Sequence, residues 1–253
     1  MRFDGTVTAI TGAGHGMGRA AALRLAAEGG AVACLDLSGE TAEETARLAS
    51  ERGGRALGLA CDVRRRADLE RALEATLKQF GKVTNLVNCA GALTMDGVYE
   101  IDDEAWDLVV GVNLKGVLLA IQVFGPAIEK AGGGAIVNLT SIEADAVVAS
   151  GPNTQPHYAC SKGGVKTMTR TLAHDFGRKN IRINAIAPGL IATGFGGSDP
   201  TSTRYQQYVR EHSALKRAGQ AEEVASAIAF LLSEDASYIT GAQLPVDGGW
   251  LIY

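Results

Sequence analysis

Short apolar runs alternate with longer segments of helical periodicity along almost the whole chain. The apolar runs span residues 6–11, 31–36, 55–61, 84–90, 134–141 and 181–188, and a shorter one lies near 243–249. The helical segments between them span 18–29, 41–52, 66–80, 102–130, 158–178 and 221–233. Continuous apolar runs are typical of strands that are covered on both faces, and strands that alternate with helices predict a parallel sheet. We therefore expect an α/β fold with a doubly wound parallel sheet and helices on both faces.

The chain length fits one large domain. It has 253 residues, and no linker, repeat or low-complexity tract divides it, so we expect a single domain over residues 1–253. The least regular stretches, 142–156 and 191–212, both follow predicted strands. Long loops in compact domains are usually functional, and open α/β sheets bind ligands beyond the carboxyl ends of their strands. We expect these two stretches to border a binding site.

Charge and cysteine usage exclude several classes of protein. The formal net charge is −4, without the basic stripe that nucleic acid requires. Gly, Asp and Arg interrupt every apolar run before it reaches the length of a membrane span, and the N-terminus lacks the pattern of a signal peptide. The cysteines and histidines have no disulfide or metal-site spacing; they are Cys34, Cys61, Cys89, Cys160, His15, His157, His174 and His212. We expect a cytoplasmic protein that binds no metal, no membrane and no nucleic acid.

A glycine cluster follows the first predicted strand, in TVTAITGAGHGMGRAAAL. Its spacing over residues 11–18 is TGxxxGxG rather than GxGxxG, because residue 17 is Met. Glycines at a strand-to-helix turn let the backbone approach a pyrophosphate, which then sits on the helix N-terminus. The pattern indicates a Rossmann-type dinucleotide site, with an ordinary βα turn as the alternative. The expected cofactor contacts in this turn are Gly12, His15, Gly16, Met17 and Gly18.

An acidic residue ends the second predicted strand. The carboxylate of Asp36 can accept hydrogen bonds from the adenosine ribose, and it repels a 2′-phosphate. Neither His15 nor Leu37 is a lysine or arginine that would bind this phosphate, so the sequence favours NAD over NADP. A cap on the next helix is the alternative role for Asp36. Asp62 ends the third predicted strand, where an adenine contact and a helix cap are both open. We include Leu37 and Val63, the neighbours of these acids, among the expected cofactor contacts.

Tyr158 and Lys162 are four positions apart in HYACSKGG. Four residues are about one helical turn, so both side chains lie on one face of the predicted helix. A free tyrosine has a pKa near 10, and lowering it by roughly 3 pH units takes about 4 kcal/mol. A unit charge at ~4 Å supplies about that much at an effective dielectric constant of ~20. Lys162 is therefore sufficient to lower the pKa of Tyr158 and make it a proton acceptor; a surface pair without function is the alternative.

Further motifs occur in a fixed order along the chain. They are TGAGHGMG (11–18), NCAG (88–91), Asn113 in VNLKG, Ser141 in IVNLTS, YACSK (158–162), PGLIAT (188–193) and ITGAQLPVDGG (239–249). Together they resemble the short-chain dehydrogenase/reductase family, whose members are NAD(P)-dependent enzymes built as one domain. The resemblance covers about residues 6–249, nearly the whole chain. Cys89 stands where the family often has a second asparagine, and we interpret it as a packing residue.

This resemblance implies a role for each matching residue. Tyr158 would be the general acid/base, and Lys162 would lower the pKa of Tyr158 and bind the nicotinamide ribose. Ser141 would hydrogen-bond the substrate oxygen, and Asn113 would hold a water in a proton relay. A turn cap and a mid-helix polar residue are the structural alternatives for Ser141 and Asn113. The other implied cofactor contacts are Asn88, Ala90, Gly91, Pro188, Gly189, Ile191 and Thr193.

The residues and the resemblance together predict an NAD-dependent oxidoreductase that acts on a secondary alcohol or its ketone. The alternative enzyme is an NADP-dependent 3-oxoacyl-carrier-protein reductase, which Asp36 disfavours. A non-catalytic dinucleotide-binding regulator is a third reading, and the presence of all four catalytic residues argues against it. The resemblance also implies a homotetramer that pairs the long helices near 102–130 and 156–178.

The loop before the tyrosine is where we expect substrate selection. Tyr158 follows Ser141 by 17 residues, which is longer than the usual gap in the family. In the family this loop borders the substrate. We expect Glu143, with Asn153 or His157, to contact a polar substrate such as a polyol or a sugar-like alcohol; a solvated loop is the alternative.

Overall fold

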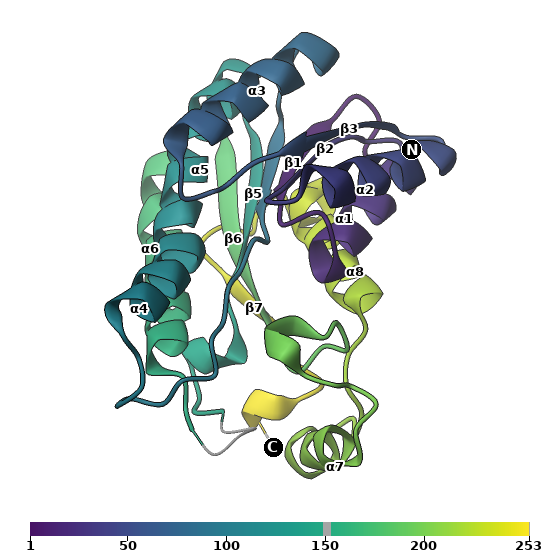
Figure 1. Ribbon diagram of the computed structural model, residues 1–253. Coiled ribbons are helices and arrows are strands. Elements are labelled where there is room, and N and C mark those ends of the chain that lie inside the picture. Colours follow the sequence, from purple (N-terminus) through teal and green to yellow (C-terminus); the bar gives the residue numbers. More distant parts are fainter. Residues whose placement is uncertain (149–152, 253) are drawn as a thin grey trace.

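One parallel sheet forms the centre of the fold in the computed structural model, which describes residues 1–148 and 153–252 (Figure 1). Within these residues the strand order is β3-β2-β1-β4-β5-β6-β7, and every neighbouring pair is parallel. The strands are β1 (Val7–Thr11), β2 (Ala31–Asp36), β3 (Arg55–Ala60), β4 (Asn85–Asn88), β5 (Gly134–Leu139), β6 (Ile181–Pro188) and β7 (Gln243–Val246). The expected doubly wound, Rossmann-type sheet is confirmed.

Helices cover both faces of this sheet (Figure 1). One face carries α1 (Gly16–Ala27), α2 (Gly39–Glu51) and α8 (Ala221–Leu232). The other face carries α3 (Arg66–Phe80), α4 (Asp103–Val110), α5 (Gly116–Lys130) and α6 (Pro156–Gly177). Each layer buries its own apolar core, with Leu25 and Ile228 on the first face and Leu69, Phe124 and Ile136 on the second.

The strand order reverses at β1. Thr8 of β1 pairs with Val32 of β2 on one side and with Asn85 of β4 on the other. The chain therefore builds β2 and β3 outward in one direction and β4 to β7 in the other. In open α/β sheets, the crevice beyond the carboxyl ends of the two strands at this reversal is where ligands bind. The turns that follow β1 and β4 accordingly border the cavity described below.

Polar side chains fix where several helices begin. Ser38 and Asp102 each accept a hydrogen bond from a backbone N–H in the first turn of α2 and α4. Gln220 and Glu223 form a reciprocal capping box at the start of α8. These signals are local in the sequence, which explains why the predicted helix starts agree with the structure to within two residues.

The edge strands β3 and β7 differ from the expectation of strands covered on both faces. No residue of β3 or β7 is fully buried, whereas every residue of β1 and β4 is. An edge strand has a neighbour on one side only, and the flanking helices cover it incompletely. The apolar run at 55–61 therefore predicted the strand correctly and its burial wrongly.

Residues 203–212 form a helix, α7 (Thr203–His212), within a stretch that we expected to be irregular. Ser202 accepts a hydrogen bond from Tyr205 N at 3.3 Å, and Arg210 and His212 lie in the last turn. A serine cap and basic residues at the far end are ordinary helix signals. The expectation of an irregular stretch is therefore wrong for residues 203–212.

The helical segment Asp103–Lys130 corrects the expectation about apolar length. By length and composition this segment could cross a membrane. However, half of its most apolar window is buried inside the fold, where Phe124 and Ile128 pack in the core against the sheet. This segment is a core helix, and its hydropathy reflects the layer that it covers.

A chain of buried polar side chains links the sheet to α6. Asn88 Nδ2 donates to Asn138 Oδ1 at 2.8 Å, and Asn138 Nδ2 donates to Thr169 Oγ1 at 2.9 Å. All three residues are at most 2% exposed. Buried polar groups cost free energy unless they are hydrogen-bonded, so these bonds fix how α6 sits on the strands.

We expect Thr169→Val to lower the free energy of unfolding by about 1–3 kcal/mol, because it leaves Asn138 Nδ2 buried without an acceptor. Chemical denaturation measures the change. Thr171→Val is the matched control, since Thr171 lies on the same helix, is exposed, and donates only to the Thr167 carbonyl. It should change the stability by no more than about 0.5 kcal/mol. Equal effects of the two substitutions would contradict the importance assigned to this chain of bonds.

Candidate active site

The turn after β1 brings the backbone close to its neighbours. Gly12 has φ +66°, and a Cβ on it would lie 2.7 Å from Ala90 Cα. Gly16 opens α1 with φ +48°. His15 precedes it with extended backbone and makes no side-chain cap hydrogen bond. The first turn of α1 thus has no side-chain acceptor from its cap residue, and it suits a phosphate group.

Asp36 lies beside this turn at the end of β2. Asp36 Oδ2 accepts a hydrogen bond from Gly14 N at 2.8 Å, and Oδ1 accepts one from Ser38 N at 3.2 Å. The carboxylate therefore both shapes the glycine turn and lines the cavity. Among the described cavity-lining residues, the lysines and arginines are Lys162 and Arg204, and these lie on α6 and α7 rather than beside Asp36.

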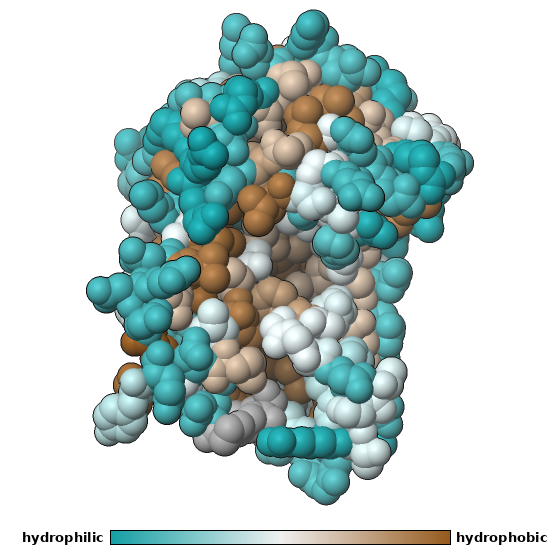
Figure 2. Space-filling view, in the orientation of Figure 1, coloured by the Kyte–Doolittle hydropathy of each residue, from teal (hydrophilic) through white to brown (hydrophobic). Residues whose placement is uncertain are grey.

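A cavity of about 860 Å³ lies beyond the carboxyl ends of the strands. Figure 2 shows this face hollowed at its centre, with apolar residues in the hollow and hydrophilic residues around the molecule's rim. The cavity brings together most of the predicted site. Those residues are Gly12, His15, Gly16, Met17, Gly18, Asp36, Gly91, Ser141, Tyr158, Lys162, Pro188, Gly189, Ile191 and Thr193.

The other predicted cofactor contacts do not line this cavity; they are Leu37, Asp62, Val63, Asn88 and Ala90. Leu37 is 70% exposed, and the Asp62 carboxylate pairs with Arg64. Val63 is buried among core residues, and Asn88 donates a hydrogen bond to Asn138, which in turn bonds to Thr169 on α6. Ala90 N donates to Thr11 Oγ1 at 3.3 Å. The cofactor contacts expected of these five residues stay predictions.

Ser141, Tyr158 and Lys162 form one buried cluster on the cavity wall. The side chains of Ser141 and Tyr158 are hydrogen-bonded to each other. Lys162 Nζ lies 5.6 Å from the centre of the Tyr158 ring and donates to the Leu139 carbonyl at 2.9 Å. The sequence spacing thus correctly predicted that tyrosine and lysine share a helix face.

Burial dominates the electrostatics of this cluster. It raises the pKa of Tyr158, with a further increase from the nearby Glu143 charge, while the hydrogen bond with Ser141 lowers it. Burial also lowers the pKa of Lys162 to about 8. The pKa of Tyr158 therefore moves opposite to the expectation from a Tyr–Lys pair. Desolvation of the phenolate, rather than the attraction of Lys162, dominates the pKa of Tyr158.

Asn113 lies outside the cavity lining and ties two segments together. It is fully buried in a one-turn π-helix, Gly111–Lys115, that joins α4 to α5 in one long helical segment. Asn113 Oδ1 accepts from Ala92 N at 2.8 Å, and Nδ2 donates to Ala92 O at 2.9 Å and to Ser161 Oγ at 3.1 Å. π turns recur at functional sites. Here the turn places Asn113 between the loop after β4 and α6.

The predicted substrate loop divides into residues that reach the cavity and residues that do not. Glu143 lines it, as expected. Asn153 and His157 do not; His157 is fully buried and its Nε2 hydrogen-bonds with Thr94 Oγ1 at 2.8 Å. Residues 149–152 of this loop lie outside the described part of the chain.

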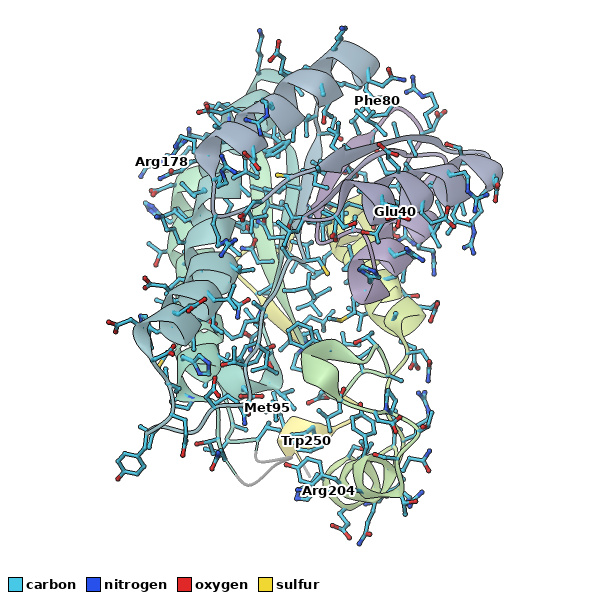
Figure 3. All side chains as sticks on the ribbon, in the orientation of Figure 1. Glu40, Phe80, Met95, Arg178, Arg204 and Trp250 are labelled. Atoms are coloured by element: carbon cyan, nitrogen blue, oxygen red, sulfur yellow. The ribbon has the colours of Figure 1, made fainter. Side chains whose placement is uncertain are left out.

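Several lining residues were missing from the sequence reading; the main ones are Cys89, Leu93, Met95, Gln155, Leu190, Phe195, Arg204, Tyr205 and Tyr208. In Figure 3, Met95 and Arg204 lie at the end of the molecule where α7 and Trp250 meet. Burial raises the pKa of the Cys89 thiol to about 12. The apolar positions of α7 were the signal that could have found Tyr205 and Tyr208.

We expect the stability of the protein to depend on Glu143 between pH 4.5 and 7. Burial raises the pKa of Glu143 from 4.5 to about 7, and the Lys162 charge opposes this increase. In this range the folded state holds a proton on Glu143 that the unfolded chain releases. The stability that Glu143 contributes to the folded state is therefore complete below pH 4.5 and is lost as the pH rises through 7.

Glu143→Gln should therefore gain stability relative to the parent by about 1–3 kcal/mol between pH 4.5 and 8. Urea unfolding of both proteins across this range measures the difference. Tyr158 and Lys162, the titratable groups that face Glu143, are present in both proteins. A difference that stays constant with pH would show that Glu143 is ionised normally.

Comparison with known proteins decides the family. The family model described as Enoyl-(Acyl carrier protein) reductase matches residues 12–251. The (3R)-3-hydroxyacyl-CoA dehydrogenase of Mus musculus is 38% identical, over 98% of this chain and 97% of its own. The 3-oxoacyl-[acyl-carrier-protein] reductase of Thermotoga maritima is 38% identical over the full length of both chains. This chain belongs to the short-chain dehydrogenase/reductase family.

A solved relative has the same arrangement of elements. The carveol dehydrogenase of Mycobacterium avium, solved in complex with NAD, has a TM-score of 0.93 and 28% identity, covering 100% of this chain and 99% of its own. This short-chain dehydrogenase/reductase is therefore an oxidoreductase that acts on CH–OH groups of small alcohols or the corresponding ketones, with NAD(P) as cofactor.

Proposed function

We propose that this enzyme interconverts a secondary alcohol and its ketone with NAD, within one domain that holds both cofactor and substrate. One observation carries the proposal. A single cavity is lined both by the glycine turn with Asp36 and by the cluster of Ser141, Tyr158 and Lys162. A dinucleotide and an acid/base are thereby brought to the same space.

The residues present fit a dinucleotide. The close approach of Gly12 to Ala90 and the uncapped start of α1 suit a pyrophosphate. Asp36 would accept the hydroxyls of the adenosine ribose. Pro188, Gly189, Ile191 and Thr193 line the cavity after β6 and would frame the nicotinamide. When bound, the nicotinamide ring supplies the hydride acceptor or donor.

Side chains of the protein would carry out the proton transfer. Tyr158 Oη would exchange a proton with the substrate oxygen, and Ser141 Oγ would hydrogen-bond that same oxygen. The Lys162 ammonium would stabilise the tyrosinate, and a pKa of about 8 keeps most of Lys162 charged at neutral pH. Asn113 would hold a water in a proton relay, and its bond to Ser161 fixes it against α6.

Asp36 supports NAD as the preferred cofactor. A 2′-phosphate would meet its carboxylate without a lysine or arginine beside it among the described lining residues. The Mycobacterium avium relative was solved with NAD, which agrees with this choice. For the substrate we propose a polyol or sugar-like alcohol, supported by Glu143 and Gln155 on the cavity wall.

An NADP-dependent 3-oxoacyl-carrier-protein reductase is the second candidate. Its support is the full-length similarity to the Thermotoga maritima enzyme, and the same Ser141, Tyr158 and Lys162 would serve it. NADPH oxidation with a 3-oxoacyl thioester tests this candidate.

We also propose a cytoplasmic homotetramer. The exposed Trp106 and Leu108 on α4 support contacts between helices of neighbouring copies. The four free cysteines agree with a reducing compartment. Size-exclusion chromatography with light scattering tests the assembly.

A screen of NADH formation tests the proposed function. The panel contains polyols, sugars, hydroxy acids and simple secondary alcohols, each with NAD and with NADP. We expect NADH from at least one secondary alcohol. Turnover confined to thioesters with NADP would favour the second candidate.

A further inference from the structure

Glu143 lies directly beside the reacting groups. It belongs to a short 3₁₀ turn, Ile142–Ala144, that follows β5 and Ser141. Glu143 N donates to Ser141 Oγ at 3.1 Å, and the Ser141 side chain is also hydrogen-bonded to Tyr158. Ser141 thus holds Glu143 at a fixed position next to the place where the substrate oxygen would bind.

The carboxylate of Glu143 differs from the other acids of the cavity. Asp36 accepts bonds from Gly14 N and Ser38 N, and Asp199 accepts bonds from the backbone and side chain of Thr201. The carboxylate of Glu143 accepts no hydrogen bond and forms no ion pair with any residue in the described part of the chain. Two residues later, Asp145 pairs with Lys166 instead.

The surroundings of Glu143 make this arrangement costly. The side chain is half-buried, burial raises its pKa, and the wall of the cavity that it lines includes the apolar residues Ile142, Val148, Leu190 and Phe195. A polar group that leaves water without a partner loses free energy. A ligand group that hydrogen-bonds the carboxyl would recover this cost, which is how a half-buried polar residue selects a substrate.

We propose that Glu143 binds a second hydroxyl on the carbon next to the reacting one, so that this enzyme prefers vicinal diols and hydroxyketones over simple alcohols. The inference rests on the proposed function. A neutral hydroxyl fits better than an ammonium group, because a hydroxyl donates to a carboxylate and accepts from a carboxylic acid. An ammonium group would also have to be desolvated among apolar side chains, close to the Lys162 charge.

The test compares two probes that differ by one hydroxyl, cyclohexane-1,2-diol and cyclohexanol. We measure kcat/KM with NAD for the parent, Glu143→Gln and Glu143→Leu. The parent should prefer the diol by at least about tenfold. In Glu143→Leu the ratio of kcat/KM for the diol to kcat/KM for cyclohexanol should fall to about one, whatever the absolute rates are, and Glu143→Gln should keep part of the preference. An unchanged preference in Glu143→Leu overturns the proposal.

Asp145→Asn is the matched control. It removes the same charge from the same segment, and Asp145 does not line the cavity. Its diol preference should equal that of the parent. A loss as large as that of Glu143→Leu would mean that disturbing the loop is enough, and it would also overturn the proposal.

Binding provides a readout that does not need turnover. With NADH present, which cannot oxidise either alcohol, cyclohexane-1,2-diol should raise the Tm of the parent more than cyclohexanol does, and Glu143→Leu should abolish this difference. Equal effects of the two probes on the parent overturn the proposal. Failure of the proposed function looks different, since no secondary alcohol in the panel would then yield NADH.

Discussion

Tyr158→Phe should lower kcat by about 10³-fold while cofactor affinity stays nearly constant. General acid–base catalysis contributes roughly 10²–10⁴-fold to a rate, and this substitution removes only the hydroxyl that would exchange a proton with substrate. The ring, which lies 6.2 Å from that of Phe195, stays in place. Steady-state kinetics of alcohol oxidation and titration with NADH measure the two quantities.

Tyr238→Phe is the control for this substitution. Tyr238 is fully exposed and does not line the cavity, so its loss of a hydroxyl should leave kcat unchanged. If Tyr158→Phe kept more than about a tenth of the parent's kcat, another group would have to supply the proton. In that case the assignment of Tyr158 as the acid/base would be wrong.

Asp36 should determine the choice of cofactor. We expect the parent to use NAD with a kcat/KM about 10²-fold or more above that for NADP, because the carboxylate and a 2′-phosphate repel each other. Asp36→Asn keeps an acceptor for Gly14 N and removes the charge. Asp36→Asn should lower the ratio of kcat/KM with NAD to kcat/KM with NADP by about tenfold. Adding Leu37→Arg should lower this ratio further, because the arginine can bind the 2′-phosphate.

Glu40→Gln is the control for the cofactor experiment. Glu40 is exposed in the first turn of α2, a few residues after Asp36, and is labelled in Figure 3. Removing its charge should leave the ratio of NAD to NADP unchanged within about twofold. A parent that prefers NADP would contradict the role given to Asp36.

The features that the sequence predicted well depend on neighbours in the chain. The turn at Gly12–Gly18 follows from glycine positions, and the shared helix face of Tyr158 and Lys162 follows from their spacing. Strand and helix starts follow from apolar runs and caps such as Ser38. Each of these signals lies within a few residues of the structure that it determines.

The features that the sequence did not predict depend on which partner each side chain contacts in the folded structure. Asp62 pairs with Arg64 and Asn88 bonds to Asn138 of a neighbouring strand, and the spacing in the sequence predicted neither partner. Burial reverses the direction of the pKa change expected for Tyr158. The His157 side chain contacts Thr94, although His157 adjoins Tyr158 in the sequence. None of these outcomes is encoded by spacing alone.

Transfer of deuterium tests the central claim most directly. A secondary alcohol found active in the screen is labelled with deuterium on its carbinol carbon and incubated with NAD and the enzyme. We predict that one deuterium appears in the NADH formed, and that Tyr158→Phe forms this product about 10³-fold more slowly. NADH without deuterium would contradict hydride transfer between a carbinol carbon and NAD in this cavity.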